Sequence, residues 1–149
     1  MELKIKALSP KIGTEIPVPS FATVGSAAMD LRACIDEDVT IAAGARAIIP
    51  TGLAIALPSA DFVALICARS GLASKFGITM ANGVGVIDSD YRGELKAALF
   101  NSSDTDYIIH NGDRIAQLMV LPVVQPTLHL VEELDETARG EGGFGSTGR

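Results

Sequence analysis

The chain is poor in the residues that mark several classes of protein. Only two of its 149 residues are cysteine, Cys34 and Cys67, which are too few for a disulfide framework and are not spaced as a metal pair. We expect both thiols to be buried and unreactive. The only histidines, His110 and His129, exclude a three-histidine metal site, and we assign neither of them a role. A general base in this protein is therefore expected to be an aspartate.

Long apolar runs are also missing. The best candidate, residues 115–124, is interrupted by Gln117 and Pro122 and falls short of the roughly 18 residues that span a bilayer. The first six residues alternate charged and apolar side chains and lack the apolar core of a secretory signal. We therefore expect a soluble, cytoplasmic protein that makes no membrane contact.

Positive charge is scarce. Lysine and arginine number 12 against 18 aspartates and glutamates, which gives a net charge of −6. Binding to a nucleic-acid backbone requires clustered cations, so a nucleic-acid partner is not expected. A small polyanion can still bind to an acidic protein where a few arginines and a metal ion converge.

The sequence is rich in short apolar segments separated by glycine and proline. Its length suits a single domain, and a hydrophobic share of 48% suits a packed core. Many short apolar segments with turn residues between them predict an all-β sandwich or barrel with antiparallel strands. One short helix is expected, with Ser70 as its N-cap and Gly77 ending it. The expected strands are residues 1–7, 39–41, 45–50, 53–57, 62–67, 94–101, 107–109 and 115–123, and the helix is 71–76.

The last eleven residues, 139–149, differ in composition from the rest. They are rich in glycine, contain one large apolar side chain and cannot form a core of their own, so we expect a flexible arm. Composition alone also fits an inert tail. The spacing of Gly140, Gly142 and Gly145 formally matches a dinucleotide-binding fingerprint, but the four residues that follow cannot form the required helix.

Two segments carry candidate chemistry. Arg69, Ser70 and Gly71 open the helix, so a guanidinium, a hydroxyl and backbone N–H groups can face one anion, although a capped helix with a surface arginine explains the same residues. Residues 82–94 are expected to form two strand edges joined by a turn, a hairpin whose backbone reads a pyrimidine.

Within residues 82–94, three side chains are candidates for function. Asn82 offers an amide that donates and accepts. Asp88 follows two apolar residues, so it is expected to be partly shielded from water and to serve as a general base. Turn chemistry explains Asp88 equally well, and Tyr91 fits a packing role as well as a ligand contact.

Five segments in order resemble the five motifs of trimeric dUTPases, and together they cover nearly the whole chain. The runs Ile-Asp-Ser-Asp-Tyr-Arg-Gly and Arg-Gly-x-Gly-Gly-Phe-Gly-Ser-Thr-Gly make the resemblance highly specific. Ala68 departs from the commonest pattern, which has proline there, so the entry to the phosphate loop is expected to be less rigid. The segments are residues 25–31, 69–73, 82–94, 112–118 and 139–148.

The resemblance implies a β jelly-roll homotrimer with active sites at the subunit boundaries. It implies a domain over residues 1–137 and an arm over 138–149 that closes over an active site. The implied reaction is hydrolysis of dUTP to dUMP and pyrophosphate, a step of nucleotide metabolism that limits uracil in DNA and supplies dUMP for thymidylate synthesis.

Roles for individual residues follow from the same resemblance. Asp88 would activate a water for in-line attack on the α-phosphorus. Tyr91 would pack under the deoxyribose and reject a 2′-hydroxyl. Uracil would contact Asn82, Val86, Ile87 and Lys96, the phosphates would contact Arg69, Ser70, Gly71 and Gln117, and the arm would supply Arg139, Ser146 and Thr147 to the triphosphate and Phe144 to stack on uracil. Mg²⁺ would bridge the three phosphates, with Asp30 reaching it through a water.

Two other functions fit parts of the sequence. A dCTP deaminase, or a bifunctional deaminase and diphosphatase, shares the jelly-roll plan and needs a glutamate beside its pocket, and Glu94 is the only glutamate near residues 82–94. A nucleotide sensor or scaffold without catalysis would keep the fold and bind partners through the arm. The run from Asp88 to Tyr91 and the complete arm favour hydrolysis.

Overall fold

The computed structural model describes residues 1–143, and nearly all of the regular secondary structure within them is short strands. The all-β prediction with one helix is confirmed. The elements are β1 (Lys4–Ala7), β2 (Met29–Arg32), β3 (Val39–Ile41), β4 (Arg46–Pro50), β5 (Leu53–Ala56), β6 (Phe62–Cys67), α1 (Ser70–Phe76), β7 (Ile78–Met80), β8 (Gly85–Ile87), β9 (Lys96–Asn101), β10 (Tyr107–Ile109) and β11 (Arg114–Pro122).

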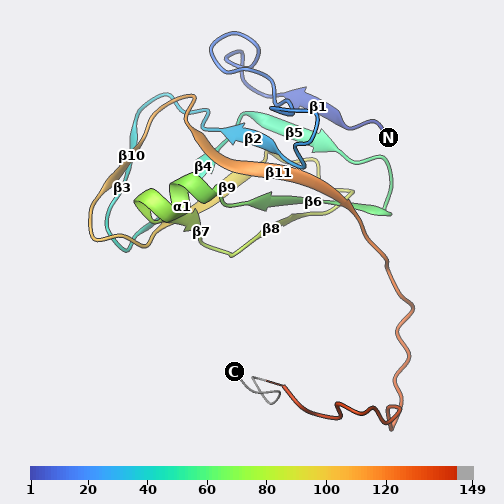
Figure 1. Cartoon of the computed structure of the whole chain (residues 1–149). Coiled ribbons are helices and arrows are strands. Elements are labelled where there is room, and N and C mark those ends of the chain that lie inside the picture. Colours follow the sequence, from blue (N-terminus) through green and yellow to red (C-terminus); the bar gives the residue numbers. More distant parts are fainter. Residues whose placement is uncertain (144–149) are drawn as a thin grey trace.

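The strands form a sandwich whose larger sheet has the order β2-β11-β6-β8 (Figure 1). A second sheet has the order β4-β9-β7, and two strand pairs, β1-β5 and β10-β3, extend the layers. All named pairs are antiparallel, as a jelly-roll arrangement requires. The side chains that alternate inward fill the space between the layers.

The core is aliphatic. Along β9 the burial alternates with period two, so Ala97, Leu99 and Asn101 point inward. Asn101 is fully buried but satisfied, because its amide nitrogen donates to the carbonyls of Ile41 (2.9 Å) and Thr105 (2.7 Å). Cys34 and Cys67 are free and only half-buried, so the expectation that both are buried is wrong. Each directly follows a fully buried residue, Ala33 or Ile66, so alternation along the extended chain turns the thiol to the opposite, partly exposed face.

The helix begins one residue earlier than expected. Arg69, in extended conformation, is the N-cap, and Ser70 is the first helical residue, so the assignment of Ser70 as N-cap is wrong. The shift follows from the carbonyl of Arg69, which accepts the first helical hydrogen bond from the backbone N–H of Ala73 (3.0 Å). Gly77 ends the helix in the left-handed region with φ 68°, as predicted.

The predicted hairpin within residues 82–94 is also wrong. β8 pairs with β6, whereas β9 pairs with β4 and β7, so the intervening segment crosses from one sheet to the other. Leu95 explains the crossing: it is fully buried, and its N–H and C=O bond the backbone of Leu53 and Thr51. The turn after β8 does form, with the N–H of Tyr91 donating to the carbonyl of Asp88 (3.2 Å).

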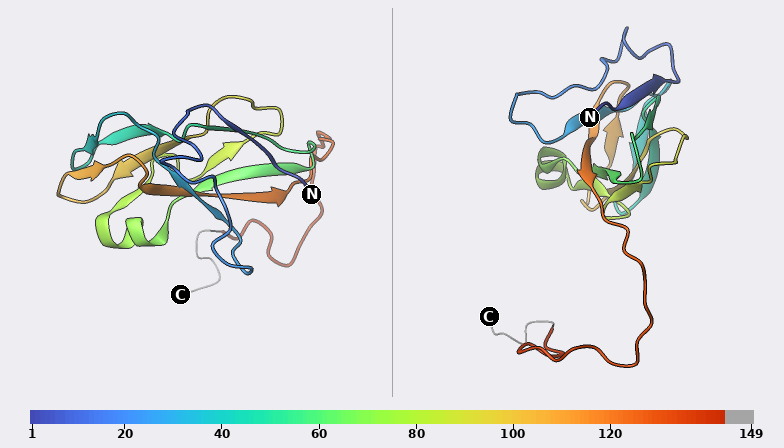
Figure 2. Two further views of the ribbon diagram at one scale, coloured as in Figure 1. Left: turned by 90° about the horizontal axis from the view of Figure 1, so that it is seen from above. Right: turned by 90° about the vertical axis from the view of Figure 1, so that its right-hand side faces the viewer.

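Two strands were not predicted, and the end of the chain leaves the sandwich. These are β2 and β7, of four and three residues. After β11, the N–H of Val123 donates to the carbonyl of Asp61 (2.8 Å), and the chain then runs away from the sheets (Figures 1 and 2). Within residues 1–143, no helix has the length and apolar character needed to cross a membrane.

Candidate active site

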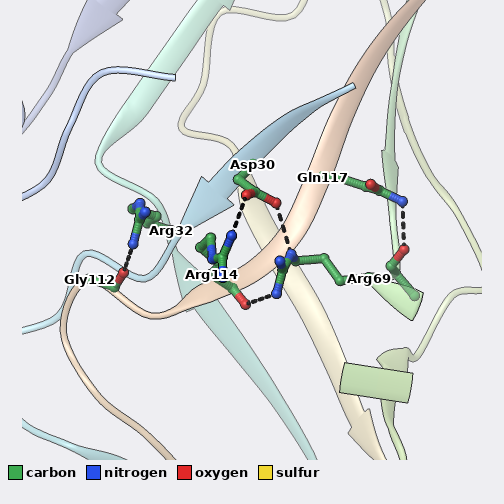
Figure 3. A network of polar contacts seen from close by, with 7 residues as sticks. Asp30, Arg32, Arg69, Gly112, Arg114 and Gln117 are labelled. Carbon is green, nitrogen blue, oxygen red and sulfur yellow. Dashed lines mark hydrogen bonds and ion pairs between the residues drawn. The ribbon is translucent and has the colours of Figure 1, made fainter. Parts of the chain in front are cut away.

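A carboxylate between two arginines lies at one edge of the larger sheet (Figure 3). Asp30 accepts from Nε of Arg69 at 2.8 Å through Oδ1, and from Nη1 of Arg114 at 3.3 Å through Oδ2. Arg69 also donates from Nη1 to the backbone carbonyl of Arg114 (3.3 Å). The three residues come from β2, from the segment before α1 and from β11, so strand pairing brings them together.

Strand register explains why these residues meet. Gln117 lies opposite Asp30 on one side and opposite Cys67 on the other. The side-chain amide of Gln117 donates to the carbonyl of Ala68 (2.9 Å), directly before Arg69. The structure thus brings together Asp30, Arg69 and Gln117, which the sequence places far apart.

A cavity of about 200 Å³ lies beside this cluster. Burial raises the pKa of the Tyr107 hydroxyl at the cavity wall, and the charge of Asp113 raises it further, while Arg69 opposes both. Ser70 and Gly71 are exposed at the start of α1, and a Cβ at Gly71 would meet no atom within 4 Å. The cavity is lined by Arg69, Leu72, Tyr107, Ile109, Asp113, Arg114 and Ile115.

The second group of predicted residues follows β8. Asp88 is exposed in the single chain, which corrects the expectation that its apolar neighbours shield it: Val86 is itself 59% exposed. The Tyr91 hydroxyl donates to the carbonyl of Glu94 (3.1 Å), and the ring lies where a Cβ at Gly93 would collide with it. Residue 93 must therefore be glycine for Tyr91 to adopt this position.

The residues predicted to contact uracil lie around the same strand. Asn82 is exposed before β8, and Ile87 is half-buried within it. β8 is the last strand of its sheet in the described part of the chain, so one edge of its backbone is not in a ladder. Lys96 begins β9, and its ammonium lies 3.7 Å from Glu94, whose other oxygen accepts from the N–H of Gly52 (2.9 Å).

The single chain keeps the two groups apart. Asp30 and Ile87 lie on the two outer strands of the sheet, three strand spacings across and three residues along. At ordinary strand spacings this separation is roughly 17 Å. Among residues 1–143, no hydrogen bond or ion pair joins Asp88 or Tyr91 to Asp30 or Arg69.

The arm is only partly described. Arg139 is exposed, and its Nε donates to the carbonyl of Gly142 (2.8 Å), away from the sheets. Phe144, Ser146 and Thr147 lie outside the described residues.

Asp30 is the residue predicted to face a metal. Each of its oxygens already accepts from an arginine, but a carboxylate offers about four lone pairs, so each oxygen keeps one for a water. No group of three or more histidine, cysteine, aspartate or glutamate side chains suited to a metal occurs within residues 1–143. The donors present fit an ion that retains waters and is held mainly by a phosphate ligand.

Sequence reasoning missed Arg114 as part of this site. It stands inside the segment 112–118 that was singled out for Gln117, and a cation three residues before that amide was the available signal. Its hydrogen bond to Asp30 depends on a register shift in β11 that cannot be predicted from the residue types.

Comparison with known proteins identifies the family. A sequence model of the dUTPase family matches residues 14–148. The chain is 51% identical to the deoxyuridine 5′-triphosphate nucleotidohydrolase of Idiomarina loihiensis and 49% identical to that of Klebsiella pneumoniae, covering 99% of this chain and 98% and 97% of theirs.

Solved structures agree. A mutant of the dUTPase of Staphylococcus bacteriophage 80alpha, solved with dUpNHpp, matches with a TM-score of 0.86 and 28% identity over 99% of both chains. A mutant dUTPase from phage phi11 of S. aureus, described for its structural Mg(II) ion, matches with a TM-score of 0.78 and 25% identity over 91% of this chain and all of that one. This chain belongs to the dUTPase family.

Proposed function

We propose that the chain hydrolyses dUTP to dUMP and pyrophosphate, with Asp88 activating the water that attacks the α-phosphorus in line. The observation that carries the activity is identity of about one half to named deoxyuridine triphosphate nucleotidohydrolases across 99% of the chain. Asp88 is the aspartate of the turn after β8, and its exposed carboxylate is free to accept a proton from water. The reaction removes dUTP, a precursor of uracil in DNA, and supplies dUMP for thymidylate synthesis.

The phosphates bind where Arg69, Ser70 and Gly71 meet Gln117. Nε of Arg69 donates a hydrogen bond to Asp30, so the orientation of the guanidinium is set before the ligand binds. The open space over Gly71 lets a phosphate oxygen approach the backbone N–H groups at the start of α1. These groups offset the negative charge that builds on the leaving pyrophosphate.

The free edge of β8 reads the base. Backbone groups of Val86 and Ile87 and the amide of Asn82 match the donors and acceptors of uracil, and Lys96 contacts the same ring. A pocket built on backbone groups discriminates against cytosine, whose pattern leaves them unpaired. Tyr91, fixed by its bond to the carbonyl of Glu94, packs against the deoxyribose and excludes a 2′-hydroxyl.

We expect Mg²⁺ to bind with the substrate. A hard divalent cation held with the phosphates would polarise them and offset their charge. Asp30 would hold this cation through a water, using the lone pairs that Arg69 and Arg114 leave free. The structural Mg(II) ion of the phage phi11 dUTPase is consistent with a metal in this family.

The site is shared between chains of a homotrimer. The separation of roughly 17 Å between the Asp30 cluster and β8 supports this arrangement, because one α-phosphate must meet both groups. The exposed Asp88 then gains its shield from a neighbouring subunit. Residues 138–149 act as an arm on the domain of residues 1–137: Arg139, Ser146 and Thr147 bind the triphosphate, and Phe144 stacks on uracil and excludes water.

The test is pyrophosphate release from dUTP, measured beside dTTP, dCTP and UTP, with Mg²⁺ and with excess chelator. We expect release from dUTP alone, and only with the metal. Binding of dUpNHpp without turnover of dUTP would mean that the protein is a nucleotide sensor and not an enzyme. Uracil nucleotides formed from dCTP would indicate a deaminase, which the structure disfavours because Glu94 is engaged by Gly52 and Lys96.

A further inference from the structure

A bulge in β11 places Arg114 on the functional face of the sheet. Gln117 pairs with Asp30 and Ala116 with Leu31, but Arg114, rather than Ile115, pairs with Arg32. The extra residue is Ile115, and both Ile115 and Ala116 are buried, which regular alternation does not allow. Without the bulge, Arg114 would point to the same side as Ala116, into the core.

The bulge therefore creates the contact between Arg114 and Asp30. Arg114 lies on the same face as Asp30 and Gln117 and donates to Oδ2 of Asp30, while Arg69 occupies Oδ1 (Figure 3). The bulged backbone also presents the carbonyl of Arg114 to Nη1 of Arg69. Arg69 is thus held at two nitrogens, and one residue, Arg114, contributes to both contacts.

Burial separates the roles of the two arginines. The side chain of Arg69 is 23% exposed and that of Arg114 51% exposed, so Arg69 is the more closely packed partner. A carboxylate that is bound at only one oxygen can still rotate. The bond from Arg114 fixes the second oxygen of Asp30. The first oxygen is then kept on Nε of Arg69.

We propose that Arg114 is a positioning residue that acts through Asp30 and through its own carbonyl to orient Arg69 toward the substrate phosphates, an inference that rests on the proposed function. The bulge of β11 is the structural device that makes this possible.

The test is a double-mutant cycle with Arg69→Gln, Arg114→Gln and the double variant, and Arg46→Gln on β4 as the matched surface control. We expect Arg114→Gln to weaken dUpNHpp binding about tenfold, as for loss of orientation at a charged site, and to leave inhibition by phosphate-free deoxyuridine unchanged. In the Arg69→Gln background Arg114→Gln should have no further effect. Arg114→Lys should restore most of the affinity, because the contact with Asp30 uses a single nitrogen.

Additive losses would show that Arg114 contacts the substrate itself and would overturn the proposal, as would unchanged binding in Arg114→Gln. A readout without nucleotide separates this result from failure of the proposed function. The Nε–H resonance of Arg69 should be protected from solvent exchange in the wild type and lose that protection in Arg114→Gln. An unchanged resonance would overturn the positioning role even if dUTP is hydrolysed.

Discussion

Asp88, Asp90 and Tyr91 occupy one tight turn, and the sequence alone cannot separate catalysis from turn chemistry there. The structure shows that the turn is closed by backbone atoms, from the N–H of Tyr91 to the carbonyl of Asp88. The side chain of Asp88 makes no hydrogen bond within the described residues, so its carboxylate is not needed to form the turn.

Replacement of Asp88 by asparagine tests it as the base. The amide has nearly the same size but cannot take a proton from water, so we expect dUpNHpp binding to be retained and dUTP turnover to fall by about 10²- to 10⁴-fold. Asp90→Asn, in the same exposed turn, should remain active. Wild-type turnover in Asp88→Asn would remove Asp88 from the mechanism.

His110 provides a pH-dependent contact away from the site. Its Nδ1 lies 2.8 Å from Oδ2 of Asp38, and the hydrogen bond and charge of Asp38 raise the pKa of His110 above 6.5. A raised pKa in the folded state means that the stabilisation is fully present below pH 6.5 and is lost as the pH rises through the folded pKa. Both groups are exposed, so the effect is small.

Thermal unfolding of Asp38→Asn against wild type measures this contact. We expect the variant to have a lower Tm at pH 5.5 and the same Tm at pH 9. A difference of equal size at both values would mean that the charge of His110 is not involved. An NMR titration of the His110 ring should show its pKa moving down in the variant.

At the scale of elements, the strand ends and the helix end are set by single residues. β3, β6 and β10 have the bounds that their β-branched and apolar residues predict, and Gly77 ends α1 as predicted. The helix start differs from the prediction because the carbonyl of Arg69 accepts the first helical hydrogen bond. The partner of β8 differs because pairing with the distant strand β6 decides it. Local patterns specify the type of an element better than its partner.

Alanine substitutions at Gly77 and Gly44 separate the effect of close packing at the helix end from the effect of backbone strain alone. Both have positive φ, 68° and 71°, but a Cβ at Gly77 would lie 2.9 Å from the backbone nitrogen of Ser103, whereas one at Gly44 would meet nothing within 4 Å. We expect Gly44→Ala to lower the free energy of unfolding by about 1 kcal/mol and Gly77→Ala by about 2–3 kcal/mol. Equal losses in chemical denaturation would show that the helix end moves away from Ser103.

For the whole molecule, the central question is where the two halves of the site meet. Asp88 and the Asp30 cluster lie at different corners of one sheet. If each site takes Asp88 from one chain and Arg69 from another, two inactive variants can complement each other.

Co-refolding Asp88→Asn with Arg69→Gln in equal amounts tests the shared site. Each variant alone should be nearly inactive. Random assembly should restore both residues in about a quarter of the sites, so we expect about a quarter of the wild-type rate. Sedimentation of the wild type should give the mass of a trimer. A mixture no more active than its components would mean that each site lies within one chain.

The sequence by itself determined the strand-rich class, the single helix and, through five ordered motifs, the family, because periodicity, glycine position and residue type act locally. It also marked Asp30, Arg69, Asp88 and Gln117. Only the tertiary structure decided that Arg69 and Asp30 are paired, that β8 belongs to the sheet of β6, and that a bulge turns Arg114 to the same face. These features depend on the register between strands that are distant in sequence. That register is set by which side chains are buried when the strands pair, so no local sequence pattern reveals it.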